Sequence, residues 1–123
     1  MSDNIEPSIH NLEGIQFSSI SVIQKICYDI SYRKGFHSKD FNFGEKIALA
    51  HSELSEALEH HRQKKGYSVS KKVPGINNLE EEFADLIIRL LDTSERLGLN
   101  IAKAIEEKCK YNVTRPFMHG KDY

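Results

Sequence analysis

Residues 78–90 read NLEEEFADLIIRL, and the apolar residues in this stretch recur at spacings of three and four. That periodicity is typical of an amphipathic α-helix. We expect Asn78 to cap the helix, acidic residues to occupy its first turn, where the helix dipole favours negative charge, and Gly98 to end it. The apolar stripe of this helix consists of Leu79, Phe83, Leu86, Leu90 and Leu97.

Three further segments show the same helical period. One spans residues 17–34 and ends at Gly35, one begins at Asn42 and reaches about residue 64, and one begins at Asn100 and cannot pass Pro116. Between the second and third helices, residues 66–77 read as a polar loop with a Pro-Gly turn, and this is the interior stretch that looks most dispensable. Short connections between amphipathic helices predict an all-α fold, an antiparallel bundle of about four main helices.

The bulk composition limits the class of protein. A chain of 123 residues suits one domain, with residues 1–14 as a loose N-terminal arm and 116–123 as a basic, extended C-terminal tail. The net charge of −1 gives no general attraction for a nucleic acid polymer, and we expect no nucleic acid or membrane partner. A hydrophobic content of 39% is low for a monomer, so we expect oligomerisation to complete the bundle.

Two cysteines and the first residues indicate a compartment. Cys27 and Cys109 lie in helical patterns without metal-ligand spacing, and we interpret both as reduced thiols of a cytoplasmic protein. The segment that follows Met1 lacks the basic and apolar regions of a signal peptide.

Two acidic pairs indicate a possible metal-binding site. Glu53 and Glu56 are three residues apart in the second helix, and Glu82 and Asp85 are three apart in the third. Residues at this spacing share a helix face, so two adjacent helices would bring four carboxylates together. Such a cluster repels itself unless a hard cation such as Mg²⁺ binds it. The alternative is that these are ordinary solvated charges on helix surfaces.

The fourth helix adds a lysine and an asparagine in phase with its apolar side. Lys108 and Asn112 follow Ile101 by seven and eleven residues. A lysine on such a face is unusual unless it is paired. The alternatives are an ion pair with an acidic residue of the third helix, or an aliphatic stem that lies on the apolar surface while the ammonium group reaches solvent. Opposite a metal-bound carboxylate cluster, these two residues would suit the binding of phosphate.

Together these segments resemble the all-α nucleoside triphosphate pyrophosphatases of the MazG-like superfamily. The likeness covers residues 17–115 and is carried by Glu-x-x-Glu at 53–56, Glu-x-x-Asp at 82–85 and Lys-x-x-x-Asn at 108–112. It implies hydrolysis of a (deoxy)nucleoside triphosphate, between its α and β phosphates, to a monophosphate and pyrophosphate. It also implies a helical homodimer or homotetramer and a role in cleaning the nucleotide pool.

The resemblance also implies roles for individual residues. Mg²⁺, or Mn²⁺ in its place, would be held by Glu53, Glu56, Glu82 and Asp85, with Glu53 or Glu56 as the general base. Phosphate contacts would come from Lys108, Asn112, Arg89 and Arg115. Base contacts would come from Phe36 and His37, although Phe36 and Arg89 stand where relatives carry other residues, which leaves the base preference open.

Other readings of the sequence stay open. A phosphoribosyl-ATP pyrophosphatase has the same helical pattern, and a non-catalytic nucleotide-binding or regulatory oligomer would share the fold. The third hypothesis, after the enzyme and the nucleotide-binding or regulatory protein, is a purely structural helical oligomer. The ferritin-like di-iron motif needs Glu-x-x-His, and Glu53 is followed at that spacing by Glu56 instead. His60 lies on the same row, and we interpret it as a surface residue or a neighbour of the ligands.

Overall fold

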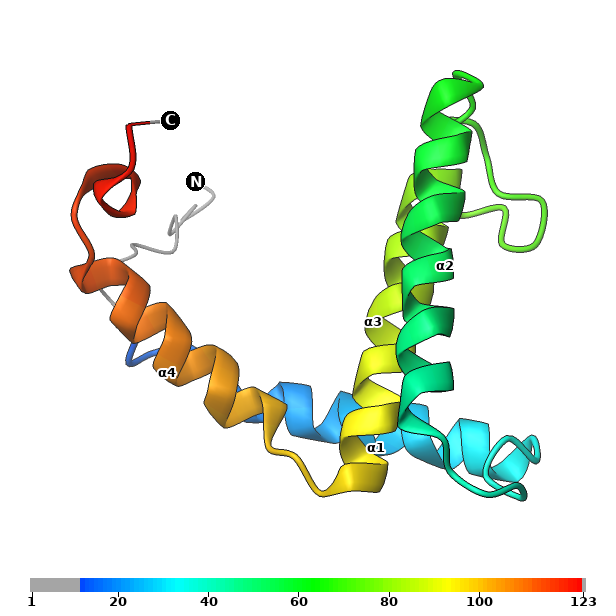
Figure 1. Cartoon of the computed structure of the whole chain (residues 1–123), viewed down its shortest axis with the longest axis horizontal. Helices are drawn as coiled ribbons and strands as arrows, with labels where there is room; N and C mark the ends of the chain where they lie inside the picture. Colours follow the sequence, from blue (N-terminus) through cyan, green and yellow to red (C-terminus); the bar gives the residue numbers. More distant parts are fainter. Residues whose placement is uncertain (1–11, 123) are drawn as a thin grey trace, which may run out of the picture. The chain divides into compact units, whose positions relative to one another are not determined.

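The computed structural model describes residues 12–122 and shows an all-α protein, as predicted. Four α-helices follow one another along the chain: α1 (Ser18–Arg33), α2 (Phe43–Arg62), α3 (Asn78–Leu97) and α4 (Ile101–Thr114) (Figure 1). A short 3₁₀ turn, η1 (Phe117–Gly120), comes last. Within the described range, the β-type pairing consists of one isolated bridge between Val69 and Asn77.

The helix ends follow the capping chemistry of the sequence with one correction. The side chains of Asn42 and Asn100 accept hydrogen bonds from the backbone N–H groups three residues on, as expected for N-caps. The cap of α3 is Asn77, whereas Asn78 is its first helical residue. Asn77 and Glu80 form a reciprocal capping box, and an N-cap needs the extended backbone that Asn77 adopts.

The chain divides into two units, each of which is described by itself. The first contains residues 12–22 and 100–122 of the described range, and the second is Ile23–Leu99. In the first unit, α4 leads into Pro116 and then η1, so the tail forms a 3₁₀ turn where we expected extended chain. Most of the predicted loose arm, residues 1–11, lies outside the described residues, as does residue 123.

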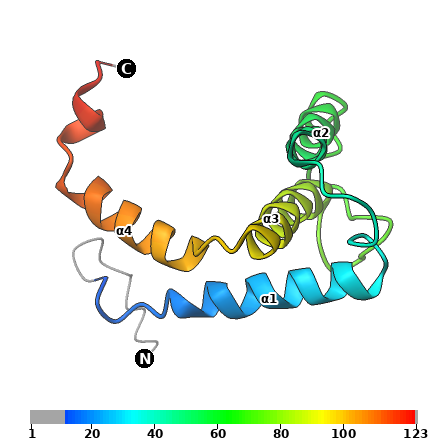
Figure 2. The ribbon, with the colours of Figure 1, turned by 60° about the horizontal axis from the view of Figure 1, so that its bottom comes forward.

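Helices α2 and α3 form the centre of the second unit. They run antiparallel and lie side by side in both views (Figure 1 and Figure 2). The small side chains of Ala50 and Ala57 are buried on α2, and Leu91 is buried on α3. Small residues let two helices approach closely, so this contact needs little apolar volume.

The predicted apolar stripes are largely exposed in the single chain. Phe83 is 51% exposed, and Leu54, Leu58, Leu90 and Leu97 are exposed as well. The face that α2 turns toward α3 instead contains buried Glu53, and the matching face of α3 contains buried Glu82. Glu53 and Glu82 therefore lie between the two helices, whereas many of the large apolar side chains are exposed.

The remaining part of the second unit is tied to α3. Gln24 on α1 is buried and donates to the Glu95 carboxylate at 3.0 Å and to the Leu99 carbonyl at 2.8 Å. Cys27 is buried, Cys109 is partly exposed in the other unit, and both are free thiols, as predicted. None of the described helices combines the length and apolar character that crossing a bilayer requires.

The loop between α2 and α3 is an ordered element. Ser70, near its middle, is only 2% exposed, and its hydroxyl donates to the Glu81 carboxylate at 2.8 Å. The same oxygen accepts from the backbone N–H groups of Lys72 and Val73. This contradicts the expectation that residues 66–77 are dispensable, because a buried hydroxyl with three partners fixes the loop to α3.

Candidate functional site

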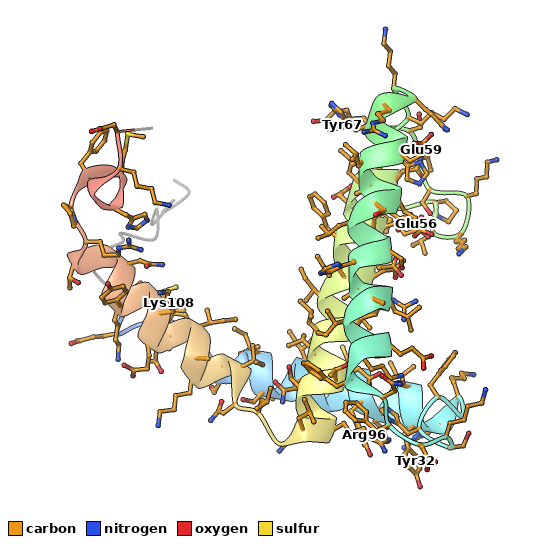
Figure 3. The ribbon with its side chains drawn as sticks, in the orientation of Figure 1. Tyr32, Glu56, Glu59, Tyr67, Arg96 and Lys108 are labelled. Carbon is orange, nitrogen blue, oxygen red and sulfur yellow. The ribbon has the colours of Figure 1, made fainter. Side chains whose placement is uncertain are left out.

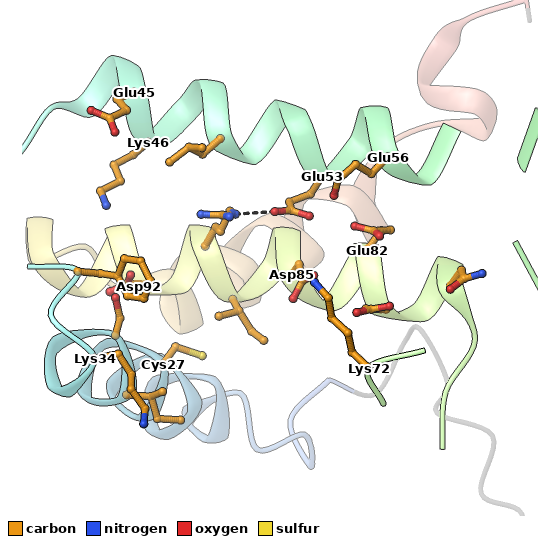
Figure 4. Close-up of a pocket in the computed structure, with 18 of the residues that line it drawn as sticks. Cys27, Lys34, Glu45, Lys46, Glu53, Glu56, Lys72, Glu82, Asp85 and Asp92 are labelled. Atoms are coloured by element: carbon orange, nitrogen blue, oxygen red, sulfur yellow. Dashed lines mark hydrogen bonds and ion pairs between the residues drawn. The ribbon is translucent and has the colours of Figure 1, made fainter. Parts of the chain in front are cut away.

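The carboxylates of the two acidic pairs meet between α2 and α3. Oxygen atoms of Glu53, Glu82 and Asp85 all lie within 4.8 Å of one another, a separation that a single cation can bridge. Figure 4 shows Glu53 and Glu56 reaching from α2 toward Glu82 and Asp85 on α3. The two three-residue spacings thus place the side chains on facing helix surfaces, as the sequence predicted.

Glu82 is the most constrained member of this cluster. The residue is 7% exposed, and its Oε1 lies 3.3 Å from Nε2 of His60. Its Oε2 is buried without a hydrogen-bond partner in the described part of the chain. A buried carboxylate oxygen without a partner is costly, and a proton or a bound cation would satisfy this atom.

The pKa values reflect the crowding. Burial, followed by the neighbouring carboxyls of Glu56 and Glu53, raises the pKa of Glu82 to about 8. Burial and the charge of Glu53 also raise the pKa of Asp85. Burial alone would raise the pKa of Glu53, but hydrogen bonding to Arg89, Glu82 and Glu56 lowers it overall. Without a cation, burial and the mutual repulsion of the carboxylates therefore favour retention of a proton by the cluster near neutral pH.

Arg89 compensates part of the negative charge. Its Nε donates to Oε1 of Glu53 at 2.7 Å, and the guanidinium is partly exposed. Among the described residues, the recorded side-chain hydrogen bond of Arg89 is made by Nε, so its terminal nitrogens can donate to a bound ligand. This is where the structure places one of the predicted phosphate-binding residues, in contact with a predicted metal ligand.

Glu56 differs from the other three acids in its exposure. It is exposed on the solvent side of α2, one helical turn after Glu53 (Figure 3). Its carboxyl is still close enough to raise the pKa of Glu82. An exposed carboxylate at the border of a buried cluster is accessible to water and to small molecules in solution.

The cluster opens into a groove of the second unit with a volume of about 1580 Å³. Sites for small molecules usually enclose roughly 300–1,000 Å³, so one such ligand would not fill it. The groove continues from the carboxylates along α3 to Asp92 and Arg96, and then to the loop after α1. It therefore joins the acidic cluster to the predicted base-binding segment.

The two predicted base-binding residues have different surroundings. Phe36 is 70% exposed and lines the groove. The side chain of His37 is 2% exposed, between Asp92 at 2.7 Å and Arg96 at 3.0 Å. Arg96 can only donate, so Nδ1 of His37 accepts and Nε2–H donates to Asp92. His37 is thus a tether between the loop and α3, and the ring of Tyr28 packs against it at 4.6 Å between centroids.

The other predicted phosphate-binding residues belong to the first unit. Lys108 and Arg115 both lie over the ring of Tyr111, at 4.8 and 5.5 Å from its centroid. Lys108 is exposed on α4 (Figure 3). Asn112 is exposed on the same helix. Their assignment as phosphate ligands stays a prediction.

The structure adds residues that the sequence reading did not assign to the site. Lys72 and Lys71 line the groove from the loop between α2 and α3. His60, for which the sequence offered a position beside the acidic residues as one interpretation, contacts Glu82. The pair of lysines shortly before an acidic helix was a possible signal, but a loop has no periodicity from which to infer proximity. Comparison of the chain with protein-family models, curated proteins and solved structures gave no match.

Proposed function

We propose that this protein is a Mg²⁺-dependent nucleoside triphosphate pyrophosphohydrolase of the MazG-like kind. The observation that carries the proposal is the buried Glu82 oxygen without a partner, set among carboxylates whose ligand atoms lie within 4.8 Å. Carboxylate oxygens are the ligands that Mg²⁺ prefers, and Mn²⁺ accepts the same set. The residues present therefore fit such an ion.

Glu53, Glu56, Glu82 and Asp85 would hold the ion. When bound there, Mg²⁺ supplies neutralisation of phosphate charge and a water of lowered pKa. Glu56 suits the role of general base, because its carboxylate is exposed at the edge of the cluster and is within reach of solvent. Arg89 keeps Glu53 ionised and offers its terminal nitrogens to the charge that develops on the departing pyrophosphate.

The experiment is a panel of ordinary and modified nucleoside triphosphates, with and without Mg²⁺, scored for monophosphate and pyrophosphate. Phosphoribosyl-ATP belongs in the same panel, because its pyrophosphatase has the same helical pattern. Glu56→Ala and Asp85→Ala should abolish pyrophosphate release while helical content by circular dichroism is kept. Full turnover in both variants would rule out this site as the catalytic one. Binding without any turnover would favour the regulatory alternative.

We also propose that the protein works as a homodimer or homotetramer. The apolar residues exposed on α2 and α3 are numerous for a monomer, and the groove is larger than a small ligand needs. A second copy of the chain packed against α2 and α3 would bury these apolar side chains and would also fill part of the groove.

A further inference from the structure

We propose that Lys72 is a polyphosphate-binding residue of the carboxylate site and that the loop between α2 and α3 is built to position it. The inference rests on the proposed function, since it assigns a ligand contact within the same site. It concerns a residue outside both acidic pairs and outside the segment at 108–115.

The position of Lys72 is the first observation. Figure 4 shows its side chain extending from the loop to the vicinity of Asp85. Its positive charge opposes the rise in the pKa of Asp85, as a nearby cation does. Lys34 and Lys46, which also line the groove, lie toward its Asp92 end.

The second observation is that the Lys72 ammonium group has no recorded side-chain partner among the described residues. Among the described residues its ammonium group takes part in no ion pair within 4.0 Å and no side-chain hydrogen bond. A lysine beside a carboxylate normally closes an ion pair. Here the ammonium group stands near the cluster with its donors free.

The third observation is the construction of the loop. The Lys72 backbone N–H donates to Oγ of Ser70, which is buried and bonded to Glu81 on α3. Ser70 N–H donates to the Ile76 carbonyl, and the Asn78 side chain donates to the Lys65 carbonyl. These contacts set the backbone of Lys72 relative to α3, the helix that carries Glu82 and Asp85.

Charge balance explains why such a lysine is needed. Four ionised carboxylates, one divalent ion and the Arg89 guanidinium sum formally to about one negative charge, which would repel a triphosphate. The positive charge of the Lys72 ammonium group at the border of the cluster would remove this repulsion. The ligand class is therefore a metal-bound polyphosphate, with Lys72 contacting its phosphate oxygens.

The test measures affinity and does not depend on turnover. Isothermal titration calorimetry of the full chain would use Mg²⁺ alone, Mg²⁺–tripolyphosphate, and a Mg²⁺-bound non-hydrolysable nucleoside triphosphate analogue. Lys72→Gln should weaken both polyphosphate ligands by the same factor, about 10- to 100-fold, and leave Mg²⁺ binding and the melting temperature unchanged. Lys72→Arg should recover most of the affinity, because the charge is restored. Lys25→Gln, an exposed α1 lysine that does not line the groove, should have no effect.

The outcomes separate this inference from the proposed function. Unchanged affinity in Lys72→Gln overturns the role of Lys72 even if the wild-type protein hydrolyses nucleotides. A specific loss of affinity supports it even if the wild-type protein shows no hydrolysis, in which case only the catalytic proposal fails. A fall in melting temperature or a loss of Mg²⁺ binding in Lys72→Gln would show a structural role and would also overturn it, as would the absence of tripolyphosphate binding by the wild-type protein.

Discussion

Arg89 on α3 donates from Nε to Oε1 of Glu53 on α2 across 2.7 Å, and Glu53 is nearly fully buried. Among the described residues, this is the shortest ion pair made with a carboxylate of the acidic cluster. It divides the site into a carboxylate that is held charged, Glu53, and one that is driven toward the neutral form, Glu82.

The first prediction concerns this ion pair. Arg89→Ala leaves Glu53 buried and uncompensated, so we expect the free energy of unfolding without metal to fall by about 1–3 kcal/mol. A bound cation takes over the lost charge, so saturating Mg²⁺ should restore much of the difference. Chemical denaturation in EDTA and in Mg²⁺ measures both values.

A matched control for Arg89 is available on α4. Lys110 forms only long, exposed contacts with Glu106 and Glu107, at 3.7 and 3.8 Å. Lys110→Ala should therefore change the unfolding free energy by about 0.5 kcal/mol or less in either condition. An equal loss for Arg89→Ala with and without Mg²⁺ would show that the guanidinium and the cation do not share Glu53.

The second prediction is a pH dependence. The folded-state pKa of Glu82 is raised to about 8 from an ordinary value of 4.5. The folded state therefore holds a proton that the unfolded state has released. The associated stability is fully present below pH 4.5 and is lost as the pH rises to 8, by up to about 1.4 kcal/mol per pH unit. Melting temperatures of the metal-free protein should thus fall between pH 5 and pH 8.

Substitution of Glu82 isolates this effect. Glu82→Gln mimics the protonated carboxyl, so its metal-free stability should vary much less over the same pH range, and at pH 8 it should exceed that of the wild-type protein. The same variant should lose the rise in melting temperature that Mg²⁺ gives the wild-type protein, a rise expected to grow with pH as the proton competes less. A wild-type melting temperature indifferent to Mg²⁺ at pH 8 would refute the metal site.

The third prediction tests the loop. A Cβ atom added at Gly66 would lie 2.8 Å from Cγ of Leu79, closer than the two carbons can approach. Gly66→Ala should destabilise the protein by about 1–3 kcal/mol, because the loop or Leu79 must move. Gly75→Ala, at a position in the same loop with no atom within 4 Å of the added carbon, is the control for thermal denaturation. Equal stability of the two variants would mean that the loop is not held against α3.

The fourth prediction concerns assembly. Phe83 lies beside Glu82 in sequence but is 51% exposed in the single chain. If a second copy buries this side chain, Phe83→Glu should shift the protein toward monomers in sedimentation velocity. Glu107→Gln, an exposed change on α4, should leave the sedimentation coefficient unchanged. A monomeric wild-type protein at micromolar concentration would remove the basis for the oligomer.

Much of the fold was predictable because caps and apolar periodicity are local signals. Asn42, Asn100 and Gly98 end or begin helices where the sequence indicated. The misplaced cap at Asn78 was avoidable, since Asn77 precedes Glu80 by the three residues of a capping box. The exposed stripes were not predictable in the same way, because periodicity identifies a face but not the partner that covers it.

The candidate site was predictable only in part. The three-residue spacing places Glu53 on the same helix face as Glu56, and Glu82 on the same face as Asp85. The antiparallel contact of α2 and α3 then brings the two pairs together. The roles of Ser70 and Lys72 depend on side-chain to backbone hydrogen bonds within a loop, for which residue spacing carries no information. The burial of His37 likewise depends on Asp92 and Arg96, which are far from it in sequence.

The tether at His37 has a geometric consequence. Asp85 belongs to the acidic cluster and Asp92 holds His37, and seven residues of the same helix separate them by about 10 Å along its axis. The distance between the acidic end of the groove and the end near Phe36 is therefore set by a helix and not by a loop. For the proposed nucleotide ligand, α3 would therefore set the distance between the site for the phosphate chain and the site for the group attached to it.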